Sequence, residues 1–241
     1  AAGVPLGTLV GGRFGWRATF AFAGALNLLG ALAIAAGVPD NEAAPPGKPS
    51  FAFLRRWDAA SNLVLVMVAF AGVFLAFGYI GPLLEELTGL GPRGVGGRQA
   101  VGGLGGAGGT VLGGALADKR PTPGVMALCF VFGGLGFVPF TAMYALAEPG
   151  SALAIAGCAL ALLIGSAAMF TLVPLLQFRV VRAAGPEAPT ALAFYFSFFY
   201  FGQGLGSAVG GLVVAVAGLA QRGLAAAVVL LLGAAIARAA P

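Results

Sequence analysis

Long apolar stretches separated by short polar turns run along almost the whole chain. A membrane-crossing helix needs about 20 largely apolar residues to span a hydrocarbon core of about 30 Å. A short apolar segment covers residues 3–12, and full-length ones cover 18–38, 61–84, 95–117, 124–146, 151–177, 190–217 and 223–239. Backbone polar groups in lipid must be hydrogen-bonded within the protein, so spans this long and apolar predict helices.

The longest polar interruption covers residues 39–60 and is rich in proline and charge, which predicts a linker. The turns on the linker's side carry Lys48, Arg55, Arg56, Lys119, Arg120, Arg179, Arg182 and Arg238. Those on the other side carry Arg13, Arg17, Arg93, Arg98 and Arg222. Because cytoplasmic loops carry the excess of Lys and Arg, we expect the linker's side to face the cytoplasm.

Composition leads to the same class of protein. Of 241 residues, 59% are hydrophobic and 9% charged, and the mean hydropathy is +0.98. Soluble domains carry about 25% charged residues, so a soluble enzyme is excluded and a polytopic membrane protein is expected. The chain has no histidine, which removes Ser-His-Asp and Cys-His chemistry and histidine metal sites. We therefore predict no catalytic residues, no metal and no cofactor.

The basic residues form no patch, so the net charge of +5 does not predict a nucleic-acid partner. Cys129 and Cys158 lie in apolar runs and are expected to be free thiols. The chain opens at Ala1 inside what reads as half of a membrane span, with no signal-peptide pattern before it. We interpret the sequence as a fragment whose upstream part is missing.

One glycine pattern, G-x-x-x-G-[TS]-x-x-G-G, occurs three times, about one hundred residues apart. Its copies are Gly3, Gly7, Gly11 and Gly12; Gly105, Gly109, Gly113 and Gly114; and Gly202, Gly206, Gly210 and Gly211. Glycines spaced by four share a helix face and let another backbone approach closely. Such a face suits helices that slide or rock against each other, and it equally suits static packing.

Two of the spans also end in similar sequences, Gly81-Pro82-Leu83-Leu84 and Val173-Pro174-Leu175-Leu176, which are expected at opposite faces of the membrane. This correspondence is expected of inverted three-helix repeats within a transporter half.

Particular residues carry a resemblance to a known family. The stretch from Gly3 to Phe20 resembles the fifth helix, with its antiporter motif, and the following loop of major facilitator superfamily efflux proteins, in particular the drug and sugar (arabinose-efflux-permease-like) branch. Residues 113–119, 173–177 with Arg179 and Val180, and the 183–189 loop are similar to the same branch.

The resemblance implies an all-α, twelve-helix major facilitator-type fold of two bundles around a central cavity, of which this chain holds about eight helices. Residues 1–38 would be helices five and six of the N-terminal bundle, 39–60 the central cytoplasmic linker, and 61–241 the C-terminal six-helix bundle. Helices one to four are absent. The loop after the fourth segment ends Asp118-Lys119-Arg120-Pro121, where the family usually continues with Gly and Arg.

In that fold the glycine faces of helices five and eight would meet, and the helix-eleven face would meet the absent helix two. Gly3, Pro5, Gly7, Gly11 and Gly12 are then candidates for a gate, with Pro5 bending the helix, or for a kinked but static span. In the loop motif of Gly114, Asp118, Lys119 and Arg120, the acid is either a latch that breaks as the halves rock or a solvated turn.

Polar residues deep in spans are the default pointers to a translocation path. Phe196, Tyr200, Gln203 and Ser207 form one stripe that suits an amphiphilic or apolar substrate, or else faces lipid and the interface. Asn27 and Tyr79 are further cavity candidates. The spans hold no acid at mid-membrane, so a proton carrier is expected in the absent helices.

We therefore expect a transporter of a small molecule that works by alternating access. Coupling to protons and outward transport of a sugar or drug-like compound are implied by the resemblance alone. The alternatives are a uniporter or facilitator of the same fold, and a non-transporting truncated scaffold. The expected partners are the lipid bilayer, the substrate and protons, with a monomer when full length, in a bacterial inner (plasma) membrane.

Overall fold

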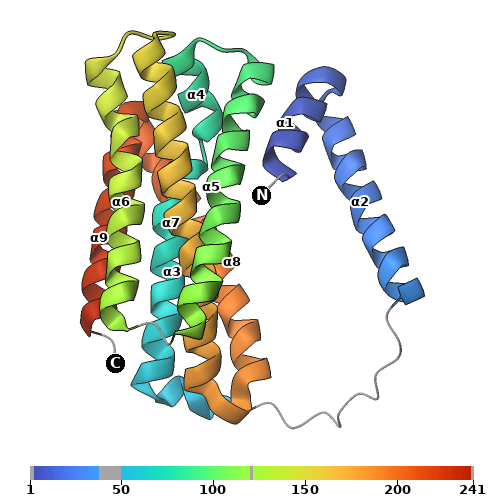
Figure 1. Cartoon of the computed structure of the whole chain (residues 1–241), viewed down its shortest axis with the longest axis vertical. Coiled ribbons are helices and arrows are strands. Elements are labelled where there is room, and N and C mark those ends of the chain that lie inside the picture. Colours follow the sequence, from blue (N-terminus) through green and yellow to red (C-terminus); the bar gives the residue numbers. More distant parts are fainter. Residues whose placement is uncertain (1–2, 38–49, 120–121, 240–241) are drawn as a thin grey trace.

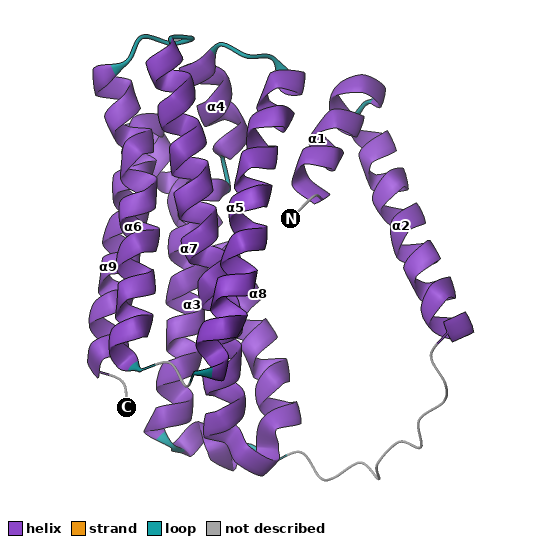
Figure 2. Ribbon diagram, viewed as in Figure 1, coloured by secondary structure: helices purple, strands orange, loops and turns teal. Residues whose placement is uncertain are grey.

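The computed structural model describes residues 3–37, 50–119 and 122–239, except the side chains of residues 4, 5, 8, 92 and 93. Within these ranges all regular structure is helical (Figure 2). The α-helices are α1 (Gly3–Phe14), α2 (Trp16–Gly37), α3 (Trp57–Phe77), α4 (Ile80–Thr88), α5 (Pro92–Asp118), α6 (Pro123–Leu146), α7 (Ala152–Ala184), α8 (Ala188–Ala217) and α9 (Arg222–Ala239). Short 3-10 turns cover η1 (Ala52–Arg55), η2 (Gly185–Glu187) and η3 (Leu219–Gln221).

Helical stretches that are long and apolar enough to cross a membrane cover every full-length span expected from the sequence. In the described part of the chain they are Trp16–Gly37, Trp57–Thr88, Gly94–Asp118, Pro123–Leu146, Ala152–Ala217 and Leu219–Ala239. The stretch Ala152–Ala217 contains two of the expected spans, α7 and α8, joined through η2. The predicted all-α membrane fold is confirmed.

Two expected boundaries differ from the structure. The polar stretch gives way to helix α3 at Trp57 rather than near residue 61, and η1 before it buries Phe53 completely against the bundle. The span expected at 61–84 is broken into α3 and α4 at Gly78 and Tyr79. Proline explains the break, because Pro82 has no N–H for the carbonyl of Gly78 and its ring would clash with that carbonyl in a continuous helix.

Helices α3 to α9 form one bundle, with α1 and α2 beside α5 (Figure 1). The buried core lies between α3, α6, α7 and α9, where Phe70, Phe130, Phe137, Leu172 and Leu230 are all at most 2% exposed. Helix α1 contacts both α2 and α5, whereas α2 has no buried residue. Much of the surface of α2 therefore has no protein partner among the described residues.

The second and third copies of the glycine pattern pack helix backbone on helix backbone. A Cβ built on Gly105, Gly109 or Gly113 of α5 would lie 2.1–2.5 Å from a carbonyl oxygen of α7. A Cβ on Gly202, Gly206 or Gly210 of α8 would lie 2.2–3.1 Å from a carbonyl oxygen of α3. At five of these glycines a Cβ does not fit, and at Gly210 it would be tight, so the glycines set the distance between these helices.

Through these contacts the helices of each half of the bundle pack on the first helix of the other half. Taking α3–α5–α6 and α7–α8–α9 as repeats, with α4 continuing the line of α3, α5 packs on α7 just as α8 packs on α3. Likewise α6 packs on α7 and α9 packs on α3. Figure 1 shows that α3 and α7 run in opposite directions along the bundle. This is the arrangement of an inverted repeat in which each half completes the other.

This packing corrects two expectations. The glycine face of the helix-eight segment, α5, is occupied by α7, so it is not the surface that meets the helix-five segment, although α1 does contact α5. The glycine face of α8 packs on α3 and needs no absent helix. These faces belong to the interior of one bundle because both partners lie in it.

The expected equivalence of Pro82 and Pro174 is also not what the structure shows. Gly206 faces Ala71 and Gly109 faces Ala167, and continuing this register makes Gly78 the counterpart of Pro174 in the other repeat. Pro82 and Pro174 are therefore about one helical turn apart in the repeat rather than equivalent. The repeats therefore differ at this position, because α3 breaks at Gly78 whereas α7 continues through Pro174 as a helix.

Candidate functional site

At the break between α3 and α4, backbone groups that a continuous helix would hydrogen-bond lie near polar side chains. Gly78 is exposed and ends α3, and Tyr79 precedes α4 with φ −128° and ψ 27°. A Cβ on Gly78 would lie 3.3 Å from Oγ of Ser207, so α8 passes directly beside the break. The break therefore brings Tyr79 and Ser207, two of the predicted cavity residues, close to each other.

A third polar group at the break is Arg222, the first residue of α9. Its side chain is 0% exposed, and Nη2 donates to the carbonyl oxygen of Leu75 in α3. The guanidinium carbon lies 4.5 Å from the centroid of the Tyr79 ring, a cation–π contact. The sequence placed Arg222 among the charges of the outer turns, and the structure adds that its side chain turns into the bundle instead of toward solvent.

The reason is the shortness of the connection between α8 and α9. Gly218, with φ +81°, ends α8, and η3 leads directly into α9, so no loop holds Arg222 in water. The signal was available in the sequence as the narrow gap between the last two apolar runs. A charge in such a gap lies at the end of the helices and can turn inward.

The remaining predicted cavity residues do not join this cluster. Phe196 and Tyr200 are 46% and 64% exposed on the surface of α8, and Gln203 is half-buried. Asn27 is exposed on α2, where its amide donates to the carbonyl oxygen of Ala23 at 2.8 Å. The stripe on α8 therefore touches the break only at its Ser207 end.

The candidate gate residues lie on α1. A Cβ on Gly7 or Gly11 would lie 3.4 or 2.8 Å from the Thr19 side chain, whose hydroxyl donates to the carbonyl oxygen of Gly7 at 3.2 Å. This part of the first glycine face therefore packs on α2. Gly3 and Gly12 are exposed, and the side chain of Pro5 is outside the description.

The loop motif lies at the end of α5. Asp118 and Lys119 are exposed there, and a Cβ on Gly114 would meet nothing within 4 Å. Lys48 and Arg120 fall outside the described residues.

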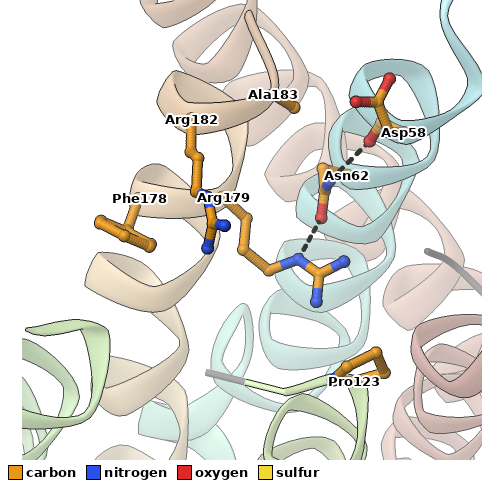
Figure 3. Close-up of a pocket in the computed structure, with 7 residues that line it drawn as sticks. All are labelled: Asp58, Asn62, Pro123, Phe178, Arg179, Arg182 and Ala183. Carbon is orange, nitrogen blue, oxygen red and sulfur yellow. Dashed lines mark hydrogen bonds between the residues drawn. The ribbon is translucent and has the colours of Figure 1, made fainter. Parts of the chain in front are cut away.

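A polar pocket that the sequence did not predict lies at the end of the bundle where α3 begins and α7 ends (Figure 3). Its volume is about 380 Å³, and it is lined by Asp58, Asn62, Pro123, Phe178, Arg179, Arg182 and Ala183. Nε of Arg179 donates to Oδ1 of Asn62 at 2.8 Å, and Nδ2 of Asn62 donates to the carbonyl oxygen of Asp58 at 2.6 Å. Asn62 is buried and links the start of α3 to the end of α7.

The same end is joined by further polar contacts. Arg56 donates to the carbonyl oxygen of Ala183, and the Ser50 hydroxyl donates to the carboxylate of Glu187. The rings of Phe51 and Phe53 both meet Phe194 edge-on, at centroid distances of 5.9 and 5.7 Å. The segment before α3 is thus fastened to the α7–α8 turn.

Comparison with known proteins agrees with the fold. The sequence profile of the Major Facilitator Superfamily matches residues 1–188. The chain is similar to the inner membrane transport protein YdhP of Escherichia coli K12, with 31% identity over 215 residues, 88% of this chain and 53% of that protein. It is 28% identical to the uncharacterized MFS-type transporter YfhI of Bacillus subtilis over 221 residues, 88% of this chain and 52% of YfhI.

A shorter match, 32% identity over 91 residues, is to the purine ribonucleoside efflux pump NepI of Salmonella enteritidis, covering 35% of this chain and 22% of the pump. The chain thus spans about half the length of YdhP and YfhI. The profile match covers more than half of the chain, which is sufficient to fix its family.

Proposed function

The chain belongs to the Major Facilitator Superfamily, and we propose that it forms part of a transporter that exports a small molecule by alternating access, driven by proton antiport. It is an integral membrane protein, and the bacterial inner membrane is the proposed location. In this proposal residues 1–38 belong to an N-terminal bundle, 39–60 are a cytoplasmic linker, and 61–241 are the C-terminal bundle.

The observation that carries the proposal is the inverted repeat whose halves pack on each other, together with the helix that is broken within it. Transporter folds place substrate sites where repeats meet and where a helix is discontinuous, because free backbone groups are tolerated only beside a cavity. Here the discontinuity at Gly78 and Tyr79 adjoins Ser207 and the buried Arg222. The efflux activity named for NepI supports the proposed outward direction.

The proposal is tested by expressing the gene from its own start codon and preparing inverted membrane vesicles. Uptake of a labelled purine ribonucleoside and of ethidium, a drug-like cation, is measured with and without an imposed inward-acidic pH gradient. Proton antiport predicts uptake that the gradient drives and that an ionophore collapses.

Gradient-independent equilibration would favour a facilitator, and no uptake of any tested compound by correctly inserted protein would favour a scaffold. Gly206→Leu, which adds a side chain where the backbone of α3 lies, is expected to abolish uptake without preventing insertion. Gly204→Leu lies on the same helix, where a Cβ would meet nothing within 4 Å, and is the matched control.

A further inference from the structure

Arg222 has more donors than partners. Its guanidinium is fully buried, and only Nη2 is hydrogen-bonded, to Leu75; Nε and Nη1 have no hydrogen-bond partner. A guanidinium carries five N–H donors and stays protonated in proteins. Arg222 is therefore a permanent, buried positive charge with donors to spare.

The groups around this charge do not neutralise it. Its neighbours include the Leu75 carbonyl, the Tyr79 ring and the backbone of Gly210, and the neutral Tyr144 hydroxyl lies near enough to interact with it. Within the described part of the chain no carboxylate pairs with it; Glu86 instead accepts a hydrogen bond from Tyr144 at 3.2 Å. An uncompensated buried charge is strongly unfavourable, and ionisable groups within membrane helices are by default functional.

One of the side chains that cover Arg222 lies at a weak point of the backbone. Tyr79 is half-buried and lies at the break between α3 and α4, so one face of its ring covers the guanidinium. Its hydroxyl would lie 2.6 Å from a Cβ on Gly211, so that glycine leaves the room that the ring occupies. A rotation of Tyr79 would uncover the face of the guanidinium that its ring now covers.

We propose that Arg222 is an anion-binding residue and that Tyr79 is its lid. The ligand is a small anionic group, either a free halide or the carboxylate of a transported compound, and it takes the hydrogen bonds of Nε and Nη1. The N-terminus of α9, where Arg222 lies, adds a favourable dipole for an anion. The use of this site by a transported compound rests on the proposed transport function; the binding itself does not.

Binding is tested on the purified chain in nanodiscs of neutral phosphatidylcholine. The thermal unfolding midpoint is followed as sodium chloride or sodium acetate replaces sodium methanesulfonate, which is bulkier than chloride and has no carboxylate, at constant ionic strength. The site predicts a saturable rise of the midpoint in the wild-type protein, absent in Arg222→Met and weakened in Arg222→Lys. A wild-type protein without a saturable response overturns the proposal even if the variants fail to fold, and so does an undiminished response in Arg222→Met.

The lid is tested through Gly211. Gly211→Ala adds a methyl group that displaces the Tyr79 ring and leaves Arg222 unchanged, so part of the opening is already accomplished in the variant. The half-saturating anion concentration is expected to fall several-fold. Gly204→Ala, on the same helix and free of neighbours within 4 Å, is expected to match the wild type. Equal concentrations for Gly211→Ala and the wild type would refute the lid.

Competition between acetate and chloride distinguishes the two possible sources of the anion. If acetate displaces chloride and binds more tightly, the site serves a carboxylate; if chloride saturates and acetate does not compete, it serves the free ion. Transport then adds an independent readout, because a carboxylated probe should depend on Arg222 and its methyl ester should not. Failure of transport with intact anion binding would count against the proposed function and leave the site standing.

Discussion

Replacing Gly206 by alanine tests whether glycine contacts hold the repeats together. The added Cβ would lie 2.2 Å from the carbonyl oxygen of Ala71 and 2.8 Å from its Cα. Both atoms belong to the α3 backbone, so neither can rotate away. Ordinary contact begins at 3.4 Å, and α8 must therefore retreat from α3 by on the order of 1 Å, a displacement that overpacking typically produces.

The cost follows from this displacement. Forcing an extra methyl group into a close-packed site costs about 1–3 kcal/mol. Alanine also gains about 0.5–1 kcal/mol over glycine in a helix interior. The control Gly204→Ala shares that gain without the clash, because nothing lies within 4 Å of its Cβ. The difference in the free energy of unfolding between the two variants is therefore expected to be about 1–3 kcal/mol.

The inverted repeat predicts the same loss of stability at the equivalent contact between α5 and α7. A Cβ on Gly109 would lie 2.1 Å from the carbonyl oxygen of Ala167, and Gly108 next to it would meet nothing within 4 Å. Unfolding in mixed micelles by titration with a denaturing detergent measures all four variants. Equal stabilities within each pair would refute the backbone contact, and a penalty at Gly206 without one at Gly109 would refute the equivalence of the repeats.

Three further changes test the rest of the bundle. Thr171→Val removes a hydroxyl that shares its proton between the Ala167 carbonyl of its own helix at 2.8 Å and the Gly109 carbonyl of α5 at 3.1 Å, and the same detergent titration should show a loss of about 0.5 kcal/mol. Pro82→Ala restores the missing amide at the break, so spin labels placed on α3 and α4 should move apart as the two helices become one. Asn62→Ala removes the acceptor of Arg179 Nε and should cost about 1 kcal/mol by the same titration. Asp58→Asn should cost less, because Asp58 contributes its backbone carbonyl to that network.

The helical spans were predictable because lipid leaves the backbone few alternatives, and apolar length alone identifies them. The glycine repeat was also visible, but its partner was not. A face of glycines indicates that the backbone of another helix comes close, but it does not identify that helix. Only the folded chain shows that Gly109 meets Ala167 within the same bundle.

The candidate site was harder to predict because its residues come from distant parts of the chain. Tyr79 and Ser207 were recognised singly as polar groups within spans, and nothing in their spacing joins them. Arg222 was recognised only as one of the charges in the outer turns, and nothing in the sequence shows that its side chain is buried. Its burial depends on a tight α8–α9 connection and on the Leu75 carbonyl, which is a tertiary contact.

The position of the glycine contacts limits where the bundle can move. Helices α5 and α8 lie on α7 and α3 at backbone distance, and the Thr171 hydroxyl adds a hydrogen bond across one of these contacts. Packed contacts of this kind are bistable rather than continuously deformable, so small displacements are resisted. In the proposed alternating access these pairs would therefore move as units. Bending is left to the break at Tyr79, where a proline has already removed one helical hydrogen bond, and the side chain there covers the buried charge of Arg222.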